Sequence, residues 1–497
     1  MFSKVLIANR GEIACRITGT LHEMGIRAVA VCSEADAQAL HVRVADEAHV
    51  LGPAEPRASY LNIDAILSAA RASGAAAIHP GYGFLAENAE FSAAVEAAGL
   101  VFLGPTAEQI RAMGDKRAAR AIARRVGVPV VPGAEGGDVG ALVGAAKAIG
   151  YPLLLKAALG GGGKGMRVVT DEAELREAFD STRRVALSGF GDASVYVEKR
   201  LERARHVEVQ VAGDGRGGVA HLFERECSLQ RRHQKVLEES PSPSLGESLR
   251  RRMWKAAMDV AREVRYRGVG TVEFLVAGDE FWFLEMNTRL QVEHPVTELV
   301  TGLDLVRLQL EIAAGQALRE GEPERRGHAI EARVYAEDAA AGFLPQAGIA
   351  TRVRWPRGPF VRVDAGIESG DAIPVHYDPI LAKVIAFAPE RDRALARLAG
   401  ALDEALVHGV VTNLPFLRAL VRAPEVERAS ADTEWIERDF MTGFSAMAAA
   451  PAPELALVAA ALAERNGSAH HAVAGDGEPP REAAFRAVGP WRLPGLA

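Results

Sequence analysis

The stretch Val5-Leu6-Ile7-Ala8-Asn9-Arg10-Gly11-Glu12 carries a short apolar run directly into a polar turn. Four consecutive apolar residues before a turn predict a buried strand, and the residues after the turn predict a helix that ends near Gly25. Further strands are predicted at Arg27–Cys32, Ala76–Ile78 and Val101–Leu103. Strands that alternate with helices of this length indicate an α/β unit, with a parallel sheet and helices on both of its faces.

Polar segments follow two of these predicted strands. Asn9-Arg10-Gly11 follows the first strand, and His79-Pro80-Gly81-Tyr82-Gly83 follows the third. Ligands of parallel sheets bind beyond the carboxyl ends of the strands. We therefore expect both segments to border a binding site.

The rest of the chain divides where the sequence pattern changes. Two prolines and the Gly-rich residues 133–137 indicate a break near residue 130. Residues 151–201 predict strand, Gly-rich loop, strand, helix and strand in that order, whereas residues 206–284 predict mainly strands. A third unit is expected at about 327–445, and the Ala- and Pro-rich residues beyond 448 predict one helix and a linker.

The composition is that of an ordinary globular protein. The 497 residues are 48% hydrophobic and 25% charged, with 58 Lys and Arg against 65 Asp and Glu, a net charge of −7. This balance excludes disorder over most of the chain, and the length suggests about three domains of roughly 100–200 residues each. A mildly acidic chain gives no reason to expect binding to nucleic acid or to a membrane surface.

The cysteines and the N-terminus indicate a reducing compartment. Cys15, Cys32 and Cys227 form no CxxC pair, which argues against a disulfide scaffold or a zinc ribbon. The N-terminus lacks the apolar core of a signal peptide, and no apolar stretch reaches the roughly 18–20 residues that span a bilayer. We expect a soluble, cytoplasmic protein.

A Gly-rich loop, Leu159-Gly160-Gly161-Gly162-Gly163-Lys164-Gly165-Met166, follows the apolar run that ends at Lys156. Consecutive glycines let a backbone fold closely around an anion, with its N–H groups pointing inward. The loop does not match a P-loop, which needs G-x-x-x-x-G-K-[ST] at the start of a helix. We expect a flexible flap that joins two antiparallel strands; the alternative is a plain hairpin tip.

Residues Thr271–Asn287 (TVEFLVAGDEFWFLEMN) predict a β-hairpin whose strands each carry one acid, Glu273 and Glu285. A two-residue loop at Gly278-Asp279 would put these acids on opposite faces, whereas a three-residue loop would place them opposite each other on one face. Close buried carboxylates repel unless a cation holds them. Together with Asn287 they would form a hard oxygen site suited to Mg²⁺; the alternative is two solvent-facing acids.

Polar residues continue to alternate after the hairpin, as Glu285, Asn287, Arg289, Gln291 and Glu293. If the chain stays extended to Pro295, these side chains share one face, as they would on a solvated edge strand too. We expect the strand to end in a site, with Arg289 as a fixed cation and Glu293 as a base. The basic run Gln230–Lys235 is a weaker signal, typical of a solvated loop or of a strand that binds an anion.

Together these segments resemble the biotin carboxylase family of the ATP-grasp superfamily, over roughly residues 1–445. The resemblance rests on seven motifs: KVLIANRGEIACRI from Lys4, HPGYGFLAEN from His79, GPTAEQIRAMGDK from Gly104, GGGGKGM from Gly160, ERECSLQRRHQKVLEE from Glu224, FLEMNTRLQVEHPVTE from Phe283 and GHAIEARVYAED from Gly327. Related ATP-grasp enzymes such as carbamoyl-phosphate synthetase are expected to share the phosphate site but to lack the second and sixth motifs.

The resemblance implies a mixed α/β and α+β fold. A Rossmann-like domain with a parallel sheet would span residues 1–114. An ATP-grasp domain would span 115–330, with a Gly-rich lid at about 132–203, and a biotin carboxylase C-terminal domain would span 331–446. Residues 447–497 would form a tail or linker.

The matching motifs also imply roles for individual residues. ATP would be bound by Lys116, Lys156, Gly162, Gly163, Glu198, Lys199, Leu201, His206, His233, Glu273 and Glu285, with residues 198–201 reading the adenine. The metal would be held by Glu273, Glu285 and Asn287. Bicarbonate would bind to Lys235, Arg289, Gln291, Val292 and Glu293, of which Lys235, Arg289 and Glu293 would be catalytic. Biotin would lie near Tyr82 and Arg333. Leu159 departs from the small residue that relatives usually have before the glycines, which puts the details of lid motion in question.

The implied reaction converts ATP, bicarbonate and biotin to ADP, phosphate and N-carboxybiotin, with Mg²⁺ or Mn²⁺. By resemblance, Glu293 deprotonates bicarbonate, which attacks the γ-phosphorus to form carboxyphosphate, and Arg289 later stabilises the oxyanion of biotin. The implied partners are a biotin carboxyl carrier protein or domain, the carboxyltransferase of an acetyl-CoA or related acyl-CoA carboxylase, and a second copy of the chain. The acyl acceptor stays open. The alternative is a catalytically silent nucleotide-binding scaffold, which would not need Glu293 or Arg289.

The last fifty residues bear on where biotin is attached. Relatives that carry their own biotin have an Ala-Met-Lys-Met-type motif, which does not occur in the 497 residues; Met447 has no neighbouring lysine. Residues 488–495 resemble the stretch that leads toward the carrier domain in α-subunits of acyl-CoA carboxylases, whereas their composition is as typical of a disordered tail. We expect biotin to arrive on another chain, or on a portion outside this sequence.

Overall fold

The computed structural model describes residues 1–136, 138–157, 166–190, 193–318, 321 and 324–448. The chain divides into a unit at Met1–Phe444 and a second unit at Ser445–Ala497. The helix and linker expected beyond residue 448 lie outside the described residues. No helix in the described part is long and apolar enough to cross a membrane.

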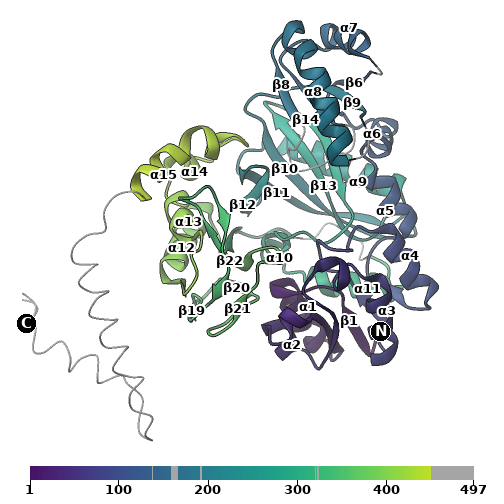
Figure 1. The fold of residues 1–497 in the computed structure, drawn as a ribbon, viewed down its shortest axis with the longest axis vertical. Coiled ribbons are helices and arrows are strands. Elements are labelled where there is room, and N and C mark those ends of the chain that lie inside the picture. Colours follow the sequence, from purple (N-terminus) through teal and green to yellow (C-terminus); the bar gives the residue numbers. More distant parts are fainter. Residues whose placement is uncertain (137, 158–165, 191–192, 319–320, 322–323, 449–497) are drawn as a thin grey trace, which may run out of the picture. The chain divides into compact units, whose positions relative to one another are not determined.

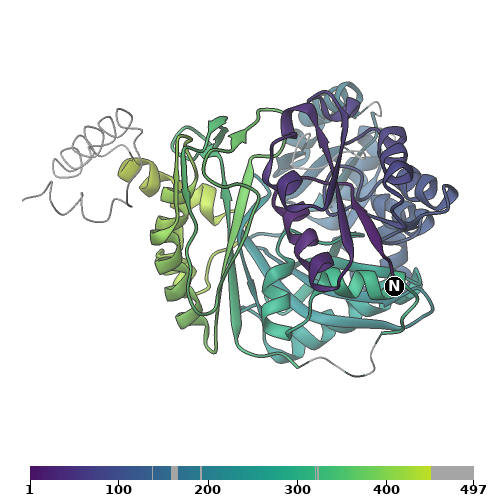
Figure 2. The same cartoon turned by 90° about the horizontal axis from the view of Figure 1, so that it is seen from below.

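The first layer is the expected α/β unit (Figures 1 and 2). Its elements are β1 (Lys4–Ile7), α1 (Gly11–Glu23), β2 (Arg27–Ser33), α2 (Leu40–Val44), β3 (Glu47–Gly52), α3 (Ile63–Ser73), β4 (Ala77–His79), α4 (Ala89–Ala97), β5 (Val101–Phe102) and α5 (Ala107–Gly114). All five strands are parallel, in the order β3-β2-β1-β4-β5. Strand β3 was not predicted, since none of its six residues is buried and only two of them have large aliphatic side chains.

Strand β1 shows why helices cover both faces of this sheet. Val5 and Ile7 belong to one buried cluster, which includes side chains of α1. Leu6 and Ala8 belong to a second cluster, which includes side chains of α3 and α4. A continuous apolar run is therefore needed, because successive strand side chains point to opposite faces.

An antiparallel sheet of eight strands carries most of the candidate site, in the order β14-β13-β10-β11-β12-β15-β22-β20. These strands are β10 (Arg205–Asp214), β11 (Val219–Arg231), β12 (Gln234–Ser240), β13 (Arg267–Ala277), β14 (Glu280–Asn287), β15 (His328–Tyr335), β20 (Val361–Ala365) and β22 (Ile380–Ala388). The sheet therefore joins the expected second and third units, and the expected boundary at residue 330 falls within β15. Helices α6 (Lys116–Arg125), α9 (Glu247–Glu263) and α11 (Leu305–Ala313) pack against its first four strands, and α10 (His294–Thr301) packs against its middle, on β11, β12 and β15.

A smaller sheet, β6-β9-β7-β8, forms a separate lobe with two helices packed on it (Figure 1). Its elements are β6 (Gly133–Glu135), α7 (Val139–Ile149), β7 (Leu153–Ala157), β8 (Met166–Val169), α8 (Glu172–Phe190) and β9 (Val195–Lys199). As expected, β7 and β8 are antiparallel, with Lys156 opposite Met166. The Gly-rich residues 158–165 lie outside the described residues.

The Gly-rich residues 133–137, which mark the break expected near residue 130, begin with a strand, because β6 occupies the first three of them. Gly133 pairs with Glu198 of β9, and a Cβ atom on Gly133 would lie 2.7 Å from the Val197 carbonyl oxygen. The glycine allows this close approach of two strands, so here it belongs to a sheet and not to a loop.

The C-terminal part of the first unit packs helices against β15, β22 and β20. Its remaining elements are β16 (Glu337–Asp338), β17 (Leu344–Pro345), β18 (Gly348–Ile349), β19 (Arg352–Arg354), β21 (Ala372–Ile373), α12 (Arg391–Glu404), β23 (Leu406–His408), α13 (Leu414–Leu420) and α14 (Pro424–Glu427). Helix α15 (Met441–Ala448) crosses the limit between the two units. Side chains of α12 and α13 form one apolar cluster with those of the three strands, which fixes the strands that carry Arg333 and Lys383.

Candidate functional site

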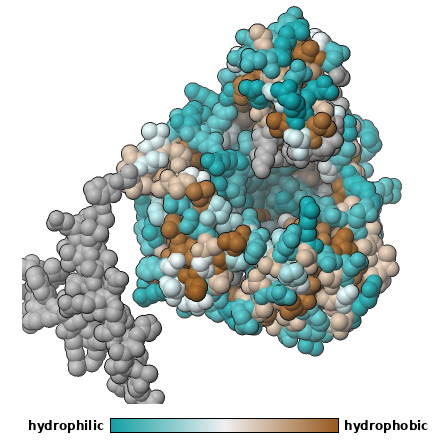
Figure 3. Space-filling view, viewed as in Figure 1, coloured by the Kyte–Doolittle hydropathy of each residue, from teal (hydrophilic) through white to brown (hydrophobic). Residues whose placement is uncertain are grey.

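A cavity of about 450 Å³ is lined by the N-terminal layer, by the first strands of the eight-stranded sheet and by residues 377–380. On the face shown in Figure 3 the molecule is hollowed beneath the lobe of the smaller sheet, and the walls of this hollow are mainly hydrophilic. The cavity brings together the following predicted site residues: Tyr82, His206, His233, Lys235, Glu273, Glu285, Asn287, Arg289, Gln291, Val292 and Arg333.

Both segments expected at the carboxyl ends of β1 and β4 reach this cavity. Asn9, Arg10 and Gly11 line it, as do Tyr82 and Gly83. The Asn9 side-chain amide donates hydrogen bonds to the carbonyl oxygens of Pro80 (2.8 Å) and Tyr82 (2.7 Å). One buried amide therefore fixes the position of the second segment against the first.

Four charged residues form one row across neighbouring strands. Arg225 of β11 lies opposite Glu208 of β10, Glu208 opposite Glu273 of β13, and Glu273 opposite Glu285 of β14. Directly opposite residues share a face of the sheet. Three adjacent carboxylates on one face repel, so the site requires cations around them.

The hairpin places Glu273 opposite Glu285 by a different route from the one considered in the sequence. Its loop has two residues, since Ala277 pairs with Glu280. A β-bulge then shifts the register between Phe274 and Glu273, which leaves Leu284 as the extra residue of β14. Of the two loops considered, the hairpin has the two-residue loop. The bulge supplies the register shift of one residue that a three-residue loop would have given.

Lys235 lies among three carboxylates. Its Nζ atom is 2.5 Å from Glu208 Oε2, 2.9 Å from Glu273 Oε1 and 2.7 Å from Glu293 Oε1. Burial alone would lower the pKa of Lys235, but these acids raise it well above its usual value and keep the ammonium charged. The lysine projects from β12 just after a tight turn at Arg232-His233, whose two residues both have positive φ. The basic run is therefore part of a hairpin.

Glu293 lies behind the cavity wall, fully buried between two cations. Oε1 contacts Lys235, and Oε2 lies 2.9 Å from the Arg333 guanidinium. Burial would raise the pKa of Glu293, but Lys235, Arg333 and Arg225 hold it well below its usual range. The expectation that the chain stays extended to Pro295 was wrong. Strand β14 ends at Asn287, and a turn leads into α10, directly after Glu293.

Arg289 is held by neighbours on three sides. Its guanidinium donates to Glu87 Oε2 (2.9 Å), Gln291 Oε1 (2.8 Å) and Asn287 Oδ1 (3.3 Å). Glu87 belongs to the second motif and also accepts from the backbone N–H of Thr288 at 2.9 Å. The turn therefore still places Arg289 beside Gln291, as an unbroken strand would have done.

The donors expected for a metal fit a hard divalent cation. Glu273 and Glu285 share one face, and Asn287 Nδ2 donates to Glu273 Oε1 at 2.9 Å, so all three side chains converge. Burial raises the pKa of Glu285, and the charge of Glu273 raises it further. By contrast, Lys235 and His206 outweigh burial and lower the pKa of Glu273. A Mg²⁺ ion between the two acids would remove this repulsion with the oxygen ligands it prefers.

The remaining predicted nucleotide residues lie around the lobe of the smaller sheet. Lys156 on β7 forms an ion pair with Glu198 on β9, whose other oxygen accepts from Arg120 at 2.6 Å. Lys199 donates to the backbone carbonyl oxygens of residues 150 and 151, so its ammonium ties β9 to the segment that precedes β7. Lys116 begins α6, and its charge acts on Glu285. Leu201 lies just past β9, and Gly162 and Gly163 are outside the described residues.

Sequence reasoning missed three acids that hold the cations of the site: Glu87, Glu208 and Glu238. Glu208 is fully buried and contacts both Lys235 and the guanidinium of Arg225, the latter at 2.5 Å. Glu238 lies 2.5 Å from Arg333. The alternation His206-Val-Glu208-Val-Gln210 was an available signal, because it has the same period as the polar series after residue 285.

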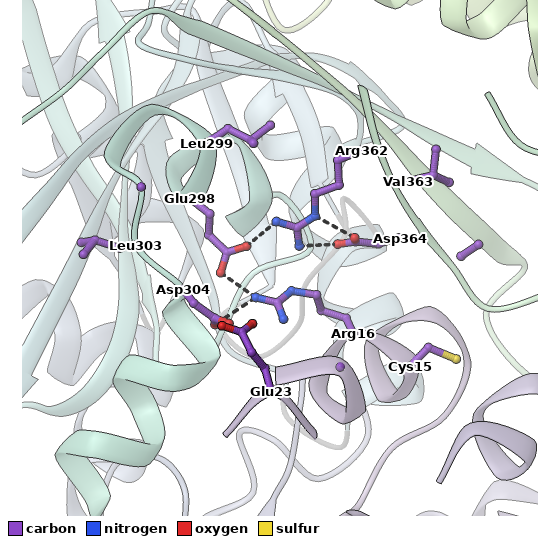
Figure 4. A pocket seen from close by; sticks show the side chains of 13 residues that line it. Cys15, Arg16, Glu23, Glu298, Leu299, Leu303, Asp304, Arg362, Val363 and Asp364 are labelled. Atoms are coloured by element: carbon purple, nitrogen blue, oxygen red, sulfur yellow. Dashed lines mark hydrogen bonds and ion pairs between the residues drawn. The ribbon is translucent and has the colours of Figure 1, made fainter. Parts of the chain in front are cut away.

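A second cavity, of about 600 Å³, lies beside α1, α10 and β20 (Figure 4). Both arginines that line it are paired with acids. Glu298 lies 2.9 Å from Arg16 and 2.7 Å from Arg362, and Arg16 is also 2.9 Å from Asp304. It contains none of the predicted site residues, so the smaller cavity is the candidate active site.

Models of three protein families match this chain. "Biotin carboxylase, N-terminal domain" matches residues 1–110, "Carbamoyl-phosphate synthase L chain, ATP binding domain" matches 115–321, and "Biotin carboxylase C-terminal domain" matches 331–438.

Curated relatives and solved structures agree with these matches. The biotin carboxylase of Pseudomonas aeruginosa is 48% identical over 443 residues, which are 88% of this chain and 98% of that protein. The propionyl-CoA carboxylase alpha chain of Ruegeria pomeroyi is 46% identical over 488 residues, 93% of this chain and 72% of that protein. The biotin carboxylase domain dimer of Hydrogenobacter thermophilus 2-oxoglutarate carboxylase, solved with MgADP, ADP and bicarbonate, superimposes with a TM-score of 0.83 at 42% identity, covering 88% of this chain and 97% of that one.

Proposed function

The chain belongs to the biotin carboxylase family, and from this premise we propose how its own residues carry out the reaction. The enzyme is an ATP-dependent ligase that uses ATP, Mg²⁺ and bicarbonate to carboxylate biotin. The observation that supports the assignment of roles is the position of Glu293. This buried carboxylate lies directly behind the cavity wall, held by Lys235 and Arg333, and Lys235 links it to Glu273, one of the two acids suited to Mg²⁺.

We assign bicarbonate to the wall formed by Lys235, Arg289, Gln291, the Val292 backbone and Glu293. Two cations attract the anion, and Glu293 is ionised and so able to accept its proton. A carboxylate paired with two cations is a weak base. Bicarbonate must therefore pair with Lys235 as it binds, which weakens the ion pair between Lys235 and Glu293 and makes Glu293 a stronger base. Proton transfer to Glu293 then frees a carbonate oxygen to attack the γ-phosphorus.

The nucleotide would lie between this wall and the lobe of the smaller sheet. Lys116 and Lys156 are the proposed phosphate ligands, and residues 198–201 with His206 and His233 are the proposed nucleoside side. Glu273, Glu285 and Asn287 would hold Mg²⁺, which when bound neutralises the charge of the phosphates. Tyr82 and Arg333 are the proposed biotin contacts, with Arg289 as the cation that stabilises the ureido oxyanion.

The scaffold alternative has no support here. Arg289 and Glu293, which catalysis needs but nucleotide binding does not, are both present, one in the wall of the cavity and the other directly behind it. Measuring ADP formation with bicarbonate, with and without free biotin, separates the two functions. The enzyme forms ADP that depends on bicarbonate and increases with biotin, whereas a scaffold forms none in either condition.

The partners follow from the relatives, several of which are subunits of larger carboxylases. We propose a biotin carrier protein or domain, a carboxyltransferase and a homodimer as the working assembly. We also propose domain boundaries at 114/115, 330/331 and 446/447. The first coincides with the start of one matched range, and another range begins at 331, inside β15. Three unpaired cysteines favour a cytoplasmic location.

Arg289→Ala is expected to slow carboxybiotin formation by about 10²–10³-fold, the usual effect of losing one electrostatic contact to a developing oxyanion. ATP affinity should change little, because Arg289 contacts Glu87, Gln291 and Asn287 and none of the proposed nucleotide residues. The assay is fixation of labelled bicarbonate on biotin, and the control is Arg251→Ala, which changes an exposed side chain of α9. Normal carboxylation with weakened ATP affinity would move Arg289 to the nucleotide site.

The purified 497-residue chain is expected to carry no covalent biotin and to prefer a separate biotinylated carrier over free biotin. Tethering or docking of biotin raises its effective concentration to roughly the millimolar range, which free biotin does not easily reach. A streptavidin blot and the rates with both forms at equal low concentration test this expectation. A positive blot contradicts the first part, and equal rates contradict the second.

A further inference from the structure

We propose that Lys383 is a positioning residue for bicarbonate activation: its ammonium holds the turn that carries Gln291 and Glu293 by binding the Val292 carbonyl oxygen. This inference rests on the function proposed above and extends it to a residue outside the cavity. Lys383 Nζ donates to Val292 O at 3.0 Å, and the side chain has no exposed surface.

The position of Lys383 in the sheet is energetically unfavourable, so other contacts must stabilise the lysine there. Lys383 of β22 lies directly opposite Arg333 of β15 on one side and opposite Asp364 of β20 on the other. Two cations directly opposite each other destabilise a sheet. A fully buried ammonium also pays a large desolvation cost unless it is paired and hydrogen-bonded.

Two acids keep the ammonium charged in place. Glu12 Oε2 lies 3.2 Å from Lys383 Nζ, and Asp364 Oδ2 lies 3.5 Å away. Asp364 is itself fixed by two hydrogen bonds of 2.8 Å from Arg362, as Figure 4 shows. Burial would lower the pKa of Lys383, but Glu12, Asp364 and Glu331 raise it above its usual value. The lysine is therefore a permanent hydrogen-bond donor beneath the turn.

The two opposed cations act on the same short segment at two points. Arg333 holds the Glu293 carboxylate at 2.9 Å, and Lys383 holds the backbone carbonyl of the preceding residue at 3.0 Å. Gln291 and Glu293, on either side of Val292, both belong to the proposed bicarbonate wall. Because β14 ends at Asn287, this turn has no strand pairing to hold its backbone. The hydrogen bond from Lys383 to the Val292 carbonyl oxygen holds the backbone instead. Misplacement of a reacting group by 1 Å can cost about 10²-fold in rate.

Lys383→Met tests the proposal, because methionine keeps a linear side chain and removes the donor. The matched control is Arg397→Met, which removes another cation that donates to a backbone carbonyl, that of Phe387 on the same strand β22, and whose contacts do not include the turn. We expect Lys383→Met to raise the KM for bicarbonate and lower kcat, each by about 10-fold, within the range set by small displacements of reacting groups. The KM for ATP should stay within about twofold in both variants, and Arg397→Met should keep the wild-type KM for bicarbonate.

Amide hydrogen exchange of residues 289–294 gives a readout that does not depend on activity. Lys383→Met should exchange faster there than the wild type and Arg397→Met, since a released turn opens more often. Unchanged exchange in this segment would overturn the proposal, and so would faster exchange with an unchanged KM for bicarbonate. If the wild type itself formed no bicarbonate-dependent ADP, the proposed function would fail, while the exchange comparison would still decide whether Lys383 holds the turn.

Discussion

Glu293→Gln is expected to lower bicarbonate-dependent ADP formation by about 10²–10⁴-fold, the usual contribution of a positioned general base. Glutamine has nearly the shape of glutamate but cannot accept the proton of bicarbonate. The substitution also leaves Arg333 with one carboxylate partner, Glu238, and Lys235 with Glu208 and Glu273. The measurement is the steady-state rate of ADP formation as a function of bicarbonate.

The affinity for ATP is the internal control for this variant. Glu293 contacts Lys235 and Arg333 and none of the proposed phosphate ligands, so nucleotide binding should stay within about twofold of the wild type. A variant that keeps more than a tenth of the wild-type rate at saturating bicarbonate would show that another group takes the proton. Loss of ATP binding together with the rate would instead show collapse of the site.

Glu273→Gln is expected to lower ATP turnover by about 100-fold or more, since groups that only support a metal ligand already account for about 10–100-fold. Glu273 has a double role here. It is one of the two facing acids proposed for Mg²⁺, and it also holds Lys235, His206, Asn287 and Gln291 through its two oxygens. The measurement is the rate of ADP formation over a Mg²⁺ titration.

Glu280→Gln is the matched control, since Glu280 begins the same strand β14 but lies exposed at the hairpin loop. It should retain wild-type turnover and the same dependence on Mg²⁺. High Mg²⁺ should restore part of the activity of Glu273→Gln, because a weakened site fills at higher ion concentration. Near-normal turnover at low Mg²⁺ would contradict the role given to the facing acids.

The hairpin shows how far the sequence alone could lead. Alternation and turn chemistry correctly predict its two strands, and the chemistry of two buried acids correctly favours their pairing. The bulge at Leu284 could not be predicted, because Leu284 fits either face of a strand locally, and its register depends on how β13 pairs with β10. Tertiary packing decides such a register, not the propensity of one residue.

The same limit separates the predicted site residues from the missed ones. Residues that stand out within one motif, such as Lys235, Arg289 and Glu293, could be selected from the sequence. Glu208 and Lys383 could not, because their importance comes from partners 27 and 91 residues away, Lys235 on β12 and Val292 in the turn after β14. A single buried acid or lysine in a strand carries no sign of which side chain it faces.

Fixation of labelled bicarbonate on a biotinylated carrier tests the central claim most directly. The purified chain is incubated with ATP, Mg²⁺, labelled bicarbonate and the carrier, and the acid-labile label on the carrier is counted beside the ADP formed. The expected result is one label fixed for each ADP, no label without ATP or biotin, and loss of both signals in Glu293→Gln. Label that forms equally with Glu293→Gln would contradict the assigned base, and no label with the wild type would contradict the activity itself.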